Sequence, residues 1–374
     1  MFDHEIIYPK EIILEITNLC NLKCRYCHFH GEDAKIRRKL GFMPSEIWKK
    51  LLNEIKKWNR PCTILTHGAG EPLLYPHLKD LLTQAKEIPE LCVGFMTNGM
   101  LLTPDISRML IELKVNSIAL SIDGVIPETH DHFRKNADLK LIESNLQYLI
   151  AEKKRSESVF PMLTFNMVGY PDILDQANDY VQKWLPHADS VMVSKFRPVG
   201  SRKLWDNTTS KPTFDANSNV SSEHTFNLTS DTTSKLASDT TSKLASDTTS
   251  NFTSDTTFNS SPFFTAPLFV ACPLLYNQTV ISIDGIVGLC CEDINLDVPV
   301  GNVLNDDLLT LYNNNPILKG YRSAHEKQEI EKLTLCSDCH VWGGHINIET
   351  YEMRIADMSV VCQASPSGKV YRKI

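Results

Sequence analysis

The sequence predicts an α/β fold in which six parallel strands form a partial (β/α)6 barrel of the TIM type. Short apolar segments alternate with amphipathic helical patterns through residues 1–206. Such alternation is typical of a parallel sheet with helices outside it. Several of the helical patterns begin with a proline, which fits the first turn of a helix. Six strands do not close an eight-stranded barrel, so we expect a partial one.

The predicted strands are short, mostly apolar and rich in β-branched or aromatic residues. They cover residues 12–16, 62–66, 92–96, 117–122, 162–168 and 190–195. The predicted helices lie between them, at residues 44–58, 76–86, 104–113, 139–154 and 171–185. In the first helix Ile47, Leu51, Leu52 and Ile55 form one apolar stripe, with lysines on the opposite face. We expect this stripe to face the sheet.

Residues 207–261 differ in composition, because Ser, Thr, Asn and Asp dominate them. The octapeptide SDTTSKLA occurs twice in succession, starting at Ser230 and at Ser238, and decayed copies follow. The regularly spaced apolar residues Leu236, Leu244 and Phe252 are too sparse for the stacked core of a solenoid. A segment of this composition does not bury a core. We therefore predict a disordered insertion.

Residues 262–374 are predicted to form a second, smaller domain with a tail. The dipeptide Asp284 and Gly285 is typical of a two-residue hairpin turn. Two strands and two helices are predicted, at residues 278–283, 286–289, 306–312 and 316–325. The residues after Cys339 are only weakly patterned.

Composition and charge exclude several function classes. The sequence has no apolar run of eighteen residues and no apolar signal core at its start, so we expect a cytoplasmic protein that does not bind membranes. Its net charge of −7 argues against a nucleic-acid partner. A short basic patch, Lys35, Arg37, Arg38 and Lys39, has two interpretations: a solvated loop, or a contact for an anionic substrate.

The eleven cysteines indicate metal binding, because a reducing compartment disfavours disulfides. Cys20, Cys24 and Cys27 follow closely on the first predicted strand. Three thiolates bind three irons of a four-iron cluster, and the missing fourth ligand leaves one iron free for a small molecule. A zinc site completed by His28 or His30 is the alternative.

Three motifs stand at the carboxyl ends of predicted strands, where parallel α/β folds place their sites. They are Gly68-Ala-Gly-Glu-Pro72, Thr97-Asn98-Gly99 and Ser121-Ile-Asp-Gly124. In this order after a CX3CXΦC loop, with Tyr26 as the aromatic Φ, they resemble the radical S-adenosylmethionine superfamily. The resemblance covers roughly residues 11–198.

The resemblance implies the cofactors and their contacts. They are a [4Fe-4S] cluster on Cys20, Cys24 and Cys27 together with S-adenosylmethionine. By resemblance Gly68, Gly70 and Glu71 hold the amino group of S-adenosylmethionine, Ser121 and Asp123 face its ribose or carboxylate, and Asn98 belongs to the same set. Arg134 would pair with the carboxylate, a natural match of charge. Its alternative is an ordinary surface arginine.

A second set of cysteines, Cys272, Cys290, Cys336 and Cys339, has the form of a four-thiolate metal site. The segment resembles the SPASM and Twitch auxiliary-cluster modules, which implies a second [4Fe-4S] cluster. A full SPASM module continues with cysteines where this sequence has His345 and Glu349, so the shorter Twitch form is favoured. Zinc remains the alternative, since four thiolates suit both metals.

Four cysteines remain outside these sets. Cys62 and Cys92 lie in apolar predicted strands and are expected to pack in the core. Cys291 and Cys362 are candidates for the thiol that donates hydrogen to a substrate radical, as in some radical epimerases.

The resemblance implies an enzyme that reductively cleaves S-adenosylmethionine and abstracts hydrogen from its substrate. Two substrate classes stay open: a ribosomal peptide, which would be epimerised or crosslinked, and a small alcohol, which would be oxidised. A flavodoxin or ferredoxin would supply electrons. One alternative is a non-catalytic iron–sulfur electron-transfer protein, which would not need the set of Gly68–Pro72, Asn98 and Ser121. The other is a zinc-binding protein, which aerobic stability and a colourless preparation would favour.

Overall fold

The computed structural model describes residues 6–31, 34, 37–196, 271–337, 339, 349–355, 358–365 and 368–374. The predicted insertion, its boundaries at 206 and 262, Lys35 and His345 lie outside these residues. No helix among the described residues is both long and apolar enough to span a bilayer.

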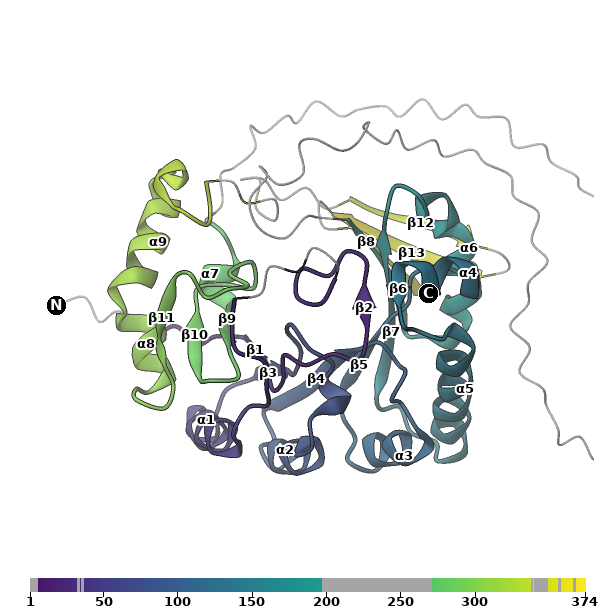
Figure 1. Ribbon diagram of the computed structural model, residues 1–374, viewed down its shortest axis with the longest axis horizontal. Coiled ribbons are helices and arrows are strands. Elements are labelled where there is room, and N and C mark those ends of the chain that lie inside the picture. Colours follow the sequence, from purple (N-terminus) through teal and green to yellow (C-terminus); the bar gives the residue numbers. More distant parts are fainter. Residues whose placement is uncertain are drawn as a thin grey trace, which may run out of the picture.

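Six parallel strands form the centre of one sheet, as predicted (Figure 1). In spatial order they are β1 (Glu11–Leu14), β3 (Cys62–Leu65), β4 (Leu91–Thr97), β5 (Ser117–Ser121), β7 (Met162–Gly169) and β8 (Ser190–Lys195). Every neighbouring pair in this series is parallel. The carboxyl ends of the strands therefore meet at one edge, which is where the predicted motifs lie.

The helices lie along the outer side of this sheet (Figure 1). They are α1 (Ser45–Trp58), α2 (Leu78–Lys86), α3 (Pro104–Glu112), α4 (Pro127–Phe133), α5 (Leu139–Arg155) and α6 (Ala177–Trp184). The prediction missed α4, and the helix predicted at 171–185 is confirmed only over Ala177–Trp184. That segment begins with a turn, and the α-helix is flanked by the 3-10 turns η2 (Leu174–Gln176) and η3 (Leu185–His187).

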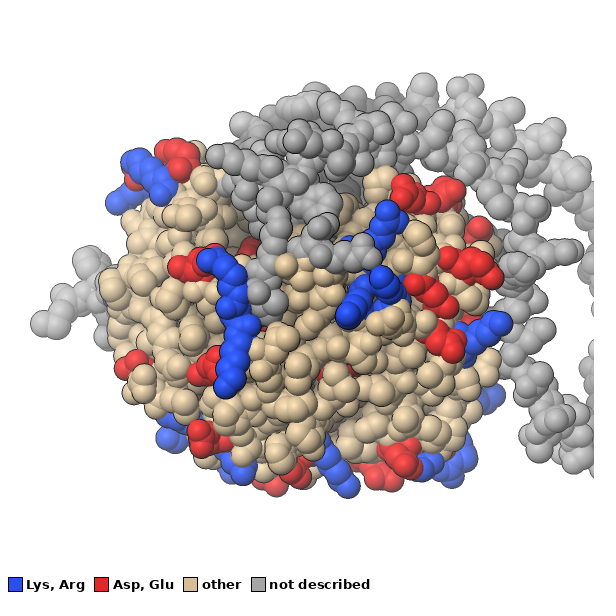
Figure 2. Space-filling view, in the orientation of Figure 1, with Lys and Arg blue, Asp and Glu red and all other residues tan. Residues whose placement is uncertain are grey.

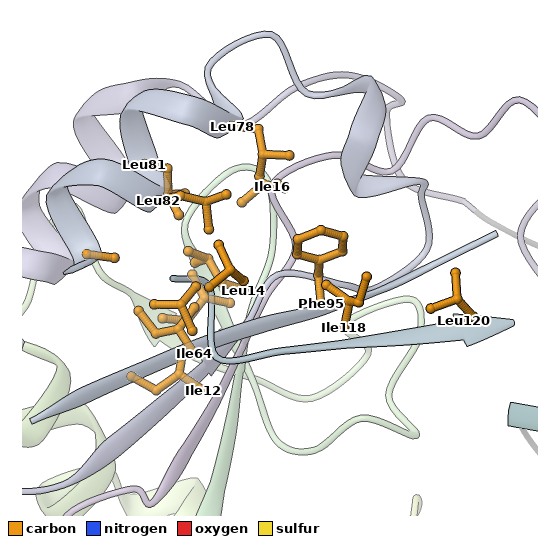
Figure 3. Close-up of a cluster of buried hydrophobic side chains, with 14 of the residues drawn as sticks. Ile12, Leu14, Ile16, Ile64, Leu78, Leu81, Leu82, Phe95, Ile118 and Leu120 are labelled. Carbon is orange, nitrogen blue, oxygen red and sulfur yellow. The ribbon is translucent and has the colours of Figure 1, made fainter. Parts of the chain in front are cut away.

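The core lies between the sheet and these helices. Figure 3 shows Leu81 and Leu82 of α2 beside Leu14 of β1 and Ile64 of β3, and all four side chains are buried. The apolar stripe predicted on α1 is buried as well. Burying one such side chain contributes roughly 1.5–3 kcal/mol to the free energy of folding. This layer therefore supplies much of the free energy that stabilises the sheet and the positions of its strand ends.

The predicted hairpin is present and extends the sheet beyond β1. Its strands are β9 (Gln278–Ile281) and β10 (Ile286–Gly288), and β11 (Pro299–Asn302) follows. Gly285 in its turn has a φ of 77°, a conformation that favours glycine. β9 pairs parallel with β1, while β10 and β11 add antiparallel strands. Beside them lie the short α7 (Leu274–Asn277) and the two predicted helices, α8 (Leu308–Asn314) and α9 (Pro316–Glu326).

The weakly patterned tail contains three strands that the prediction missed. They are β12 (Glu349–Ile355), β13 (Met358–Ser365) and β14 (Gly368–Lys373), joined as an antiparallel meander. β14 pairs antiparallel with β8 and so extends the other edge of the parallel sheet. Strands from the last third of the chain therefore border the six parallel strands on both sides, in a sheet of twelve strands among the described residues.

Candidate cofactor and metal sites

The first cysteine set lies on the loop that follows β1. Cys20, Cys24 and Cys27 are each half-buried. The loop turns tightly, because the Cys27 N–H donates to Cys24 O and the Gly31 N–H donates to Cys27 O, both at 2.9 Å. A Cβ on Gly31 would stand 2.6 Å from Cys27 O, so only glycine fits there. Two short strands, β2 (Lys23–Cys24) and β6 (Arg134–Lys135), pair and place Cys24 opposite Arg134.

The chemistry of these thiols fits an iron cluster. Burial raises the pKa of Cys20 to about 12 and also raises the pKa of Cys24 above its ordinary value. A thiolate at these positions therefore needs a nearby cation, which bound iron supplies. The Leu22 N–H points at the Cys20 sulfur at 3.4 Å, and the Arg134 Nη1 lies 4.0 Å from the Cys24 sulfur. Both are donors that stabilise a negatively charged sulfur.

The glycine motif after β3 packs directly against the cysteine loop. A Cβ on Gly70 would lie 2.5 Å from the carbonyl oxygens of both Thr17 and Leu19. The Glu71 N–H donates to the same Leu19 oxygen at 2.8 Å. The structure thus brings the predicted cofactor-binding turn to the predicted cluster, and glycine is required at the point of contact.

Glu71 joins this turn to the end of β4. Its buried carboxylate accepts hydrogen bonds from the Thr97 hydroxyl at 2.7 Å and from the N–H groups of Asn98 at 2.8 Å and Leu73 at 3.2 Å. Burial raises its pKa, and these donors oppose that effect. A carboxylate has about four acceptor positions, so one remains for the amino group that the resemblance assigns to it. The Asn98 amide also donates to Asn21 Oδ1 at 2.8 Å, which links β4 to the cysteine loop.

Asp123 and Arg134 lie against each other rather than at the surface. Arg134 Nε is 2.8 Å from Asp123 Oδ2, and both side chains are buried. Asp123 also accepts from the Tyr26 hydroxyl and, at 2.9 Å, from the Val168 N–H. Burial acts to lower the pKa of Arg134, but the Asp123 carboxylate outweighs it and the pKa lies well above its ordinary value. The interpretation of Arg134 as a surface arginine is wrong. Ser121 is also buried, at the end of β5.

Three of the four aromatic rings beside the cysteine loop were missed by sequence reasoning. The Tyr26 ring lies 4.7 Å from that of Tyr170, which stacks on Phe133 at 5.0 Å and on Phe196 at 4.2 Å. The aromatic position of the CX3CXΦC spacing was the one available signal, and it identified Tyr26 alone.

The second cysteine set converges from three elements. Cys272 precedes α7, Cys290 follows β10, and Cys336 and Cys339 follow the 3-10 turn η5 (Ile330–Lys332). Burial raises the pKa values of Cys272, Cys290 and Cys336, and neighbouring thiols raise them further. Cys339 acts on Cys272, Cys336 acts on Cys290, and both Cys339 and Cys272 act on Cys336, whose pKa rises to about 12. Each of these thiols therefore lies within electrostatic reach of another member of the set, and the prediction that all four ligate one cluster stays a prediction.

The remaining cysteines differ from one another. Cys62 is buried as predicted, but the prediction for Cys92 is wrong because its side chain is exposed. Alternate residues of β4 point to opposite faces, and Val93 and Phe95 take the buried one. Cys362 is fully buried in β13, and Cys291 is half-buried beside Cys290.

Within the described part of the chain, no three His, Cys, Asp or Glu residues are arranged to hold a single metal ion.

Comparison with known families matches both regions. A sequence model of the radical SAM superfamily matches residues 14–183, and the SPASM model, an iron–sulfur cluster-binding domain, matches residues 272–340. The chain belongs to the radical SAM superfamily, SPASM subgroup. The expectations of a [4Fe-4S] cluster with S-adenosylmethionine, and of a further iron–sulfur cluster, are confirmed for these domains. The choice of the shorter Twitch form stays a prediction.

Relatives of this radical SAM chain match it over part of their length. It is 34% identical over 119 residues to the tungsten-containing aldehyde ferredoxin oxidoreductase cofactor-modifying protein of Pyrococcus furiosus, covering 32% of each chain. It is 33% identical over 126 residues to the AdoMet-dependent heme synthase of Methanosarcina barkeri, covering 34% of each chain. It is 22% identical over 206 residues to the mycofactocin maturase MftC of Mycobacterium ulcerans, covering 55% of this chain and 52% of that one. The chain thus spans a third to about half of these relatives.

Two solved structures share the fold over most of the chain. BtrN in complex with AdoMet and 2-DOIA superposes with a TM-score of 0.53 at 17% identity, covering 89% of this chain and 93% of that one. Streptococcus suis SuiB bound to precursor peptide SuiA also gives a TM-score of 0.53, at 15% identity, covering 84% of this chain and 67% of that one.

Proposed function

We propose that this chain is a radical SAM enzyme that reductively cleaves S-adenosylmethionine and abstracts hydrogen from a ribosomal peptide, which it epimerises or crosslinks. The observation that carries the proposal is the contact between the cysteine loop and the glycine turn, where Gly70 lies against Thr17 and Leu19. When bound, the cluster and S-adenosylmethionine supply the electron and the 5′-deoxyadenosyl radical. The precursor peptide in the SuiB structure and the maturase among the relatives support a peptide substrate.

The chain's own residues would hold and orient these groups. Cys20, Cys24 and Cys27 would ligate three irons, and the remaining acceptor position of Glu71 would take the amino group. With its Nε on Asp123, Arg134 would offer its other nitrogens to a carboxylate. Reduction would need a flavodoxin or ferredoxin.

The first experiment tests cofactor cleavage. The protein, reconstituted and reduced under anaerobic conditions, should convert S-adenosylmethionine to 5′-deoxyadenosine, measured by chromatography. Replacing Cys20, Cys24 and Cys27 by alanine should abolish this, because three iron ligands are lost. Cys92→Ala is the matched control and should retain full turnover, since that thiol is exposed and lies outside both sets. Undiminished turnover in the triple variant would contradict the proposal.

The second experiment tests the other cysteine set. If Cys272, Cys290, Cys336 and Cys339 ligate a second four-iron cluster, the reconstituted wild type should contain about eight irons per chain. The Cys336→Ala/Cys339→Ala variant should contain about four irons per chain. It should lose substrate conversion while it retains part of its cofactor cleavage. The iron and zinc contents are measured together. Zinc in place of the second four irons would refute the auxiliary cluster and leave the first cluster site untouched.

Peptide and small-alcohol substrates are separated by their products. A precursor peptide should return with unchanged mass or with two hydrogens fewer, depending on epimerisation or crosslinking. Deuterium from solvent would appear in an epimerised peptide. Oxidation of a small alcohol to its carbonyl, with no change in any peptide, would show that the substrate is the small alcohol and not a peptide.

A further inference from the structure

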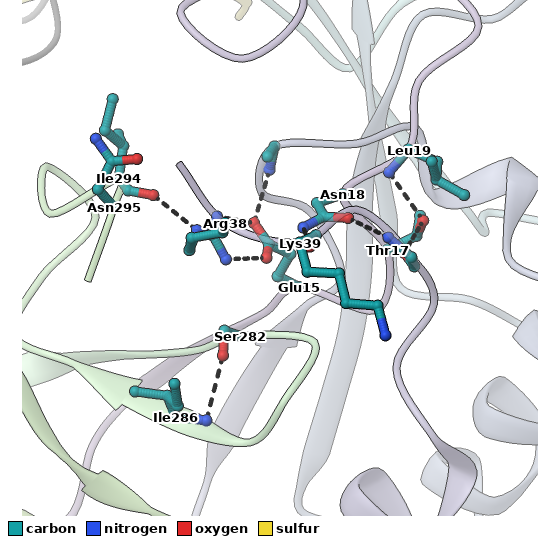
Figure 4. A network of polar contacts seen from close by, with 12 residues as sticks. Glu15, Thr17, Asn18, Leu19, Arg38, Lys39, Ser282, Ile286, Ile294 and Asn295 are labelled. Carbon is teal, nitrogen blue, oxygen red and sulfur yellow. Dashed lines mark hydrogen bonds and ion pairs between the residues drawn. The ribbon is translucent and has the colours of Figure 1, made fainter. Parts of the chain in front are cut away.

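One member of the basic patch, Arg38, is not a solvated surface side chain. Its guanidinium holds the Glu15 carboxylate with two nitrogens, Nη1 to Oε1 at 2.6 Å and Nη2 to Oε2 at 2.9 Å (Figure 4). The Arg38 side chain is 14% exposed and that of Glu15 is 5% exposed. Arg37, its neighbour, pairs with Asp297, and these side chains are 68% and 51% exposed. Buried bidentate pairs fix geometry, whereas exposed ones contribute little.

Glu15 lies directly against the glycine turn. Its Oε2 accepts a hydrogen bond from the Ala69 N–H at 3.1 Å. A Cβ on Gly68 would lie 2.9 Å from the same oxygen, so the turn approaches the carboxylate as closely as glycine allows. The Glu15–Arg38 pair therefore helps to fix the position of the glycine turn, which in turn contacts the cysteine loop.

Arg38 also contacts the loop that carries the second cysteine set. Its Nε donates to the Ile294 carbonyl at 2.9 Å, four residues after Cys290 in the sequence (Figure 4). Hydrogen bonds close the loop at this point, because the Asp293 carboxylate accepts the N–H groups of Asp297 and Val298 at 2.8 and 2.9 Å. One guanidinium thus contacts the loop of each cysteine set, through Glu15 on one side and Ile294 on the other.

We propose that Arg38 is a positioning residue that, through Glu15 and Ile294, fixes the spacing between the two cluster sites. The inference rests on the proposed function, since it requires two clusters. Arg38 belongs to neither cysteine set, and its side chain bonds to the Glu15 carboxylate and to a backbone carbonyl.

The test compares Arg38→Met, Arg38→Lys and Glu15→Gln with the control Arg37→Met in the reconstituted full chain. Hydrogen exchange is followed in residues 66–71 and 290–298, and the magnetic interaction between the two reduced clusters is measured by electron paramagnetic resonance. Arg38→Met should speed exchange at least about tenfold in both segments and should weaken or broaden the magnetic interaction. Arg37→Met should leave residues 66–71 and the interaction unchanged.

Arg38→Lys separates the two contacts. Lysine keeps the charge beside Glu15 and should restore protection at residues 66–71, but it lacks the Nε that reaches Ile294, so residues 290–298 should stay deprotected. Glu15→Gln should deprotect residues 66–71 more than residues 290–298. Unchanged exchange and an unchanged magnetic interaction in Arg38→Met would overturn the positioning role and leave the two clusters untouched. If Arg38→Met fails to fold, the same result in Arg38→Lys would overturn it. About four irons in the wild type would overturn the auxiliary cluster and the positioning role together.

Discussion

At the scale of single residues, His130 shows how strongly the site depends on buried polar groups. Its ring is fully buried in α4, and its Nδ1 accepts the Asp123 N–H at 3.0 Å. An accepting Nδ1 requires the neutral ring. Burial, followed by the charge of Arg134, lowers the pKa of His130 to about 4, although Asp123 acts in the opposite direction.

This lowered pKa predicts a pH dependence. Between pH 6.5 and about 4 the unfolded chain binds a proton at His130 that the folded chain does not, so stability falls as the pH falls through this window. The shift corresponds to roughly 3 kcal/mol. In His130→Asn, whose side-chain oxygen keeps an acceptor near Nδ1 without titrating, the free energy of unfolding should depend less steeply on pH. Urea unfolding at pH 4.5 and 7.5 measures this, and equal slopes for both proteins would contradict it.

The residues of the site were predictable to the extent that their signals are local. The first cysteine set and the glycine turn are short motifs, and the structure places them against each other. The second cysteine set is spread over residues 272–339, and its assembly into one site stays a prediction. The Asp123–Arg134 and Glu15–Arg38 pairs join residues 11 and 23 positions apart in sequence. No short motif marks such pairs, because the contact exists only after β5, β6 and the cysteine loop have packed.

At the scale of elements, the six parallel strands were predictable within one or two residues because they are apolar on both faces. The tail strands were missed because side chains such as Val360 and Cys362 are buried while their neighbours Ser359 and Val361 are not fully covered. Alternation of that kind, broken by two consecutive valines, gave too weak a pattern.

Two glycines in different elements predict opposite responses to the same substitution. Gly320 lies in the exposed middle of α9, and an added Cβ would meet nothing within 4 Å. Gly320→Ala should therefore raise the free energy of unfolding by up to about 1 kcal/mol. Gly70→Ala would drive a Cβ into two carbonyl oxygens at 2.5 Å and should displace the glycine turn.

Calorimetric unfolding and equilibrium binding of S-adenosylmethionine to the oxidised, reconstituted protein distinguish these outcomes. Gly320→Ala should bind as wild type does, and Gly70→Ala should bind at least about tenfold more weakly. Wild-type affinity in Gly70→Ala would show that the glycine turn is not part of the cofactor site.

At the scale of the whole molecule, charge gives little guidance to partners. In Figure 2, acidic and basic side chains are interspersed along the lower rim of the face shown, and much of the surface between them is uncharged. The composition of residues 207–261 instead makes a direct prediction. Deleting these residues should leave soluble expression and cofactor cleavage at wild-type levels, because a segment with so few large apolar residues adds no core. Recovery of insoluble protein alone would contradict it.

The two borders of the parallel sheet also have a consequence for how the chain is made. β1 is synthesised almost first, yet its outer neighbour β9 follows more than 260 residues later, and β14, the outer neighbour of β8, ends at Lys373. The nascent sheet presents two rows of unpaired backbone groups until β9 is made, and one row, at β8, until translation is nearly complete. Such rows are the feature that recruits other chains into aggregates. A ribosome that stalls before β14 would release a product open to such pairing at β8, whereas the finished chain covers that strand with its own.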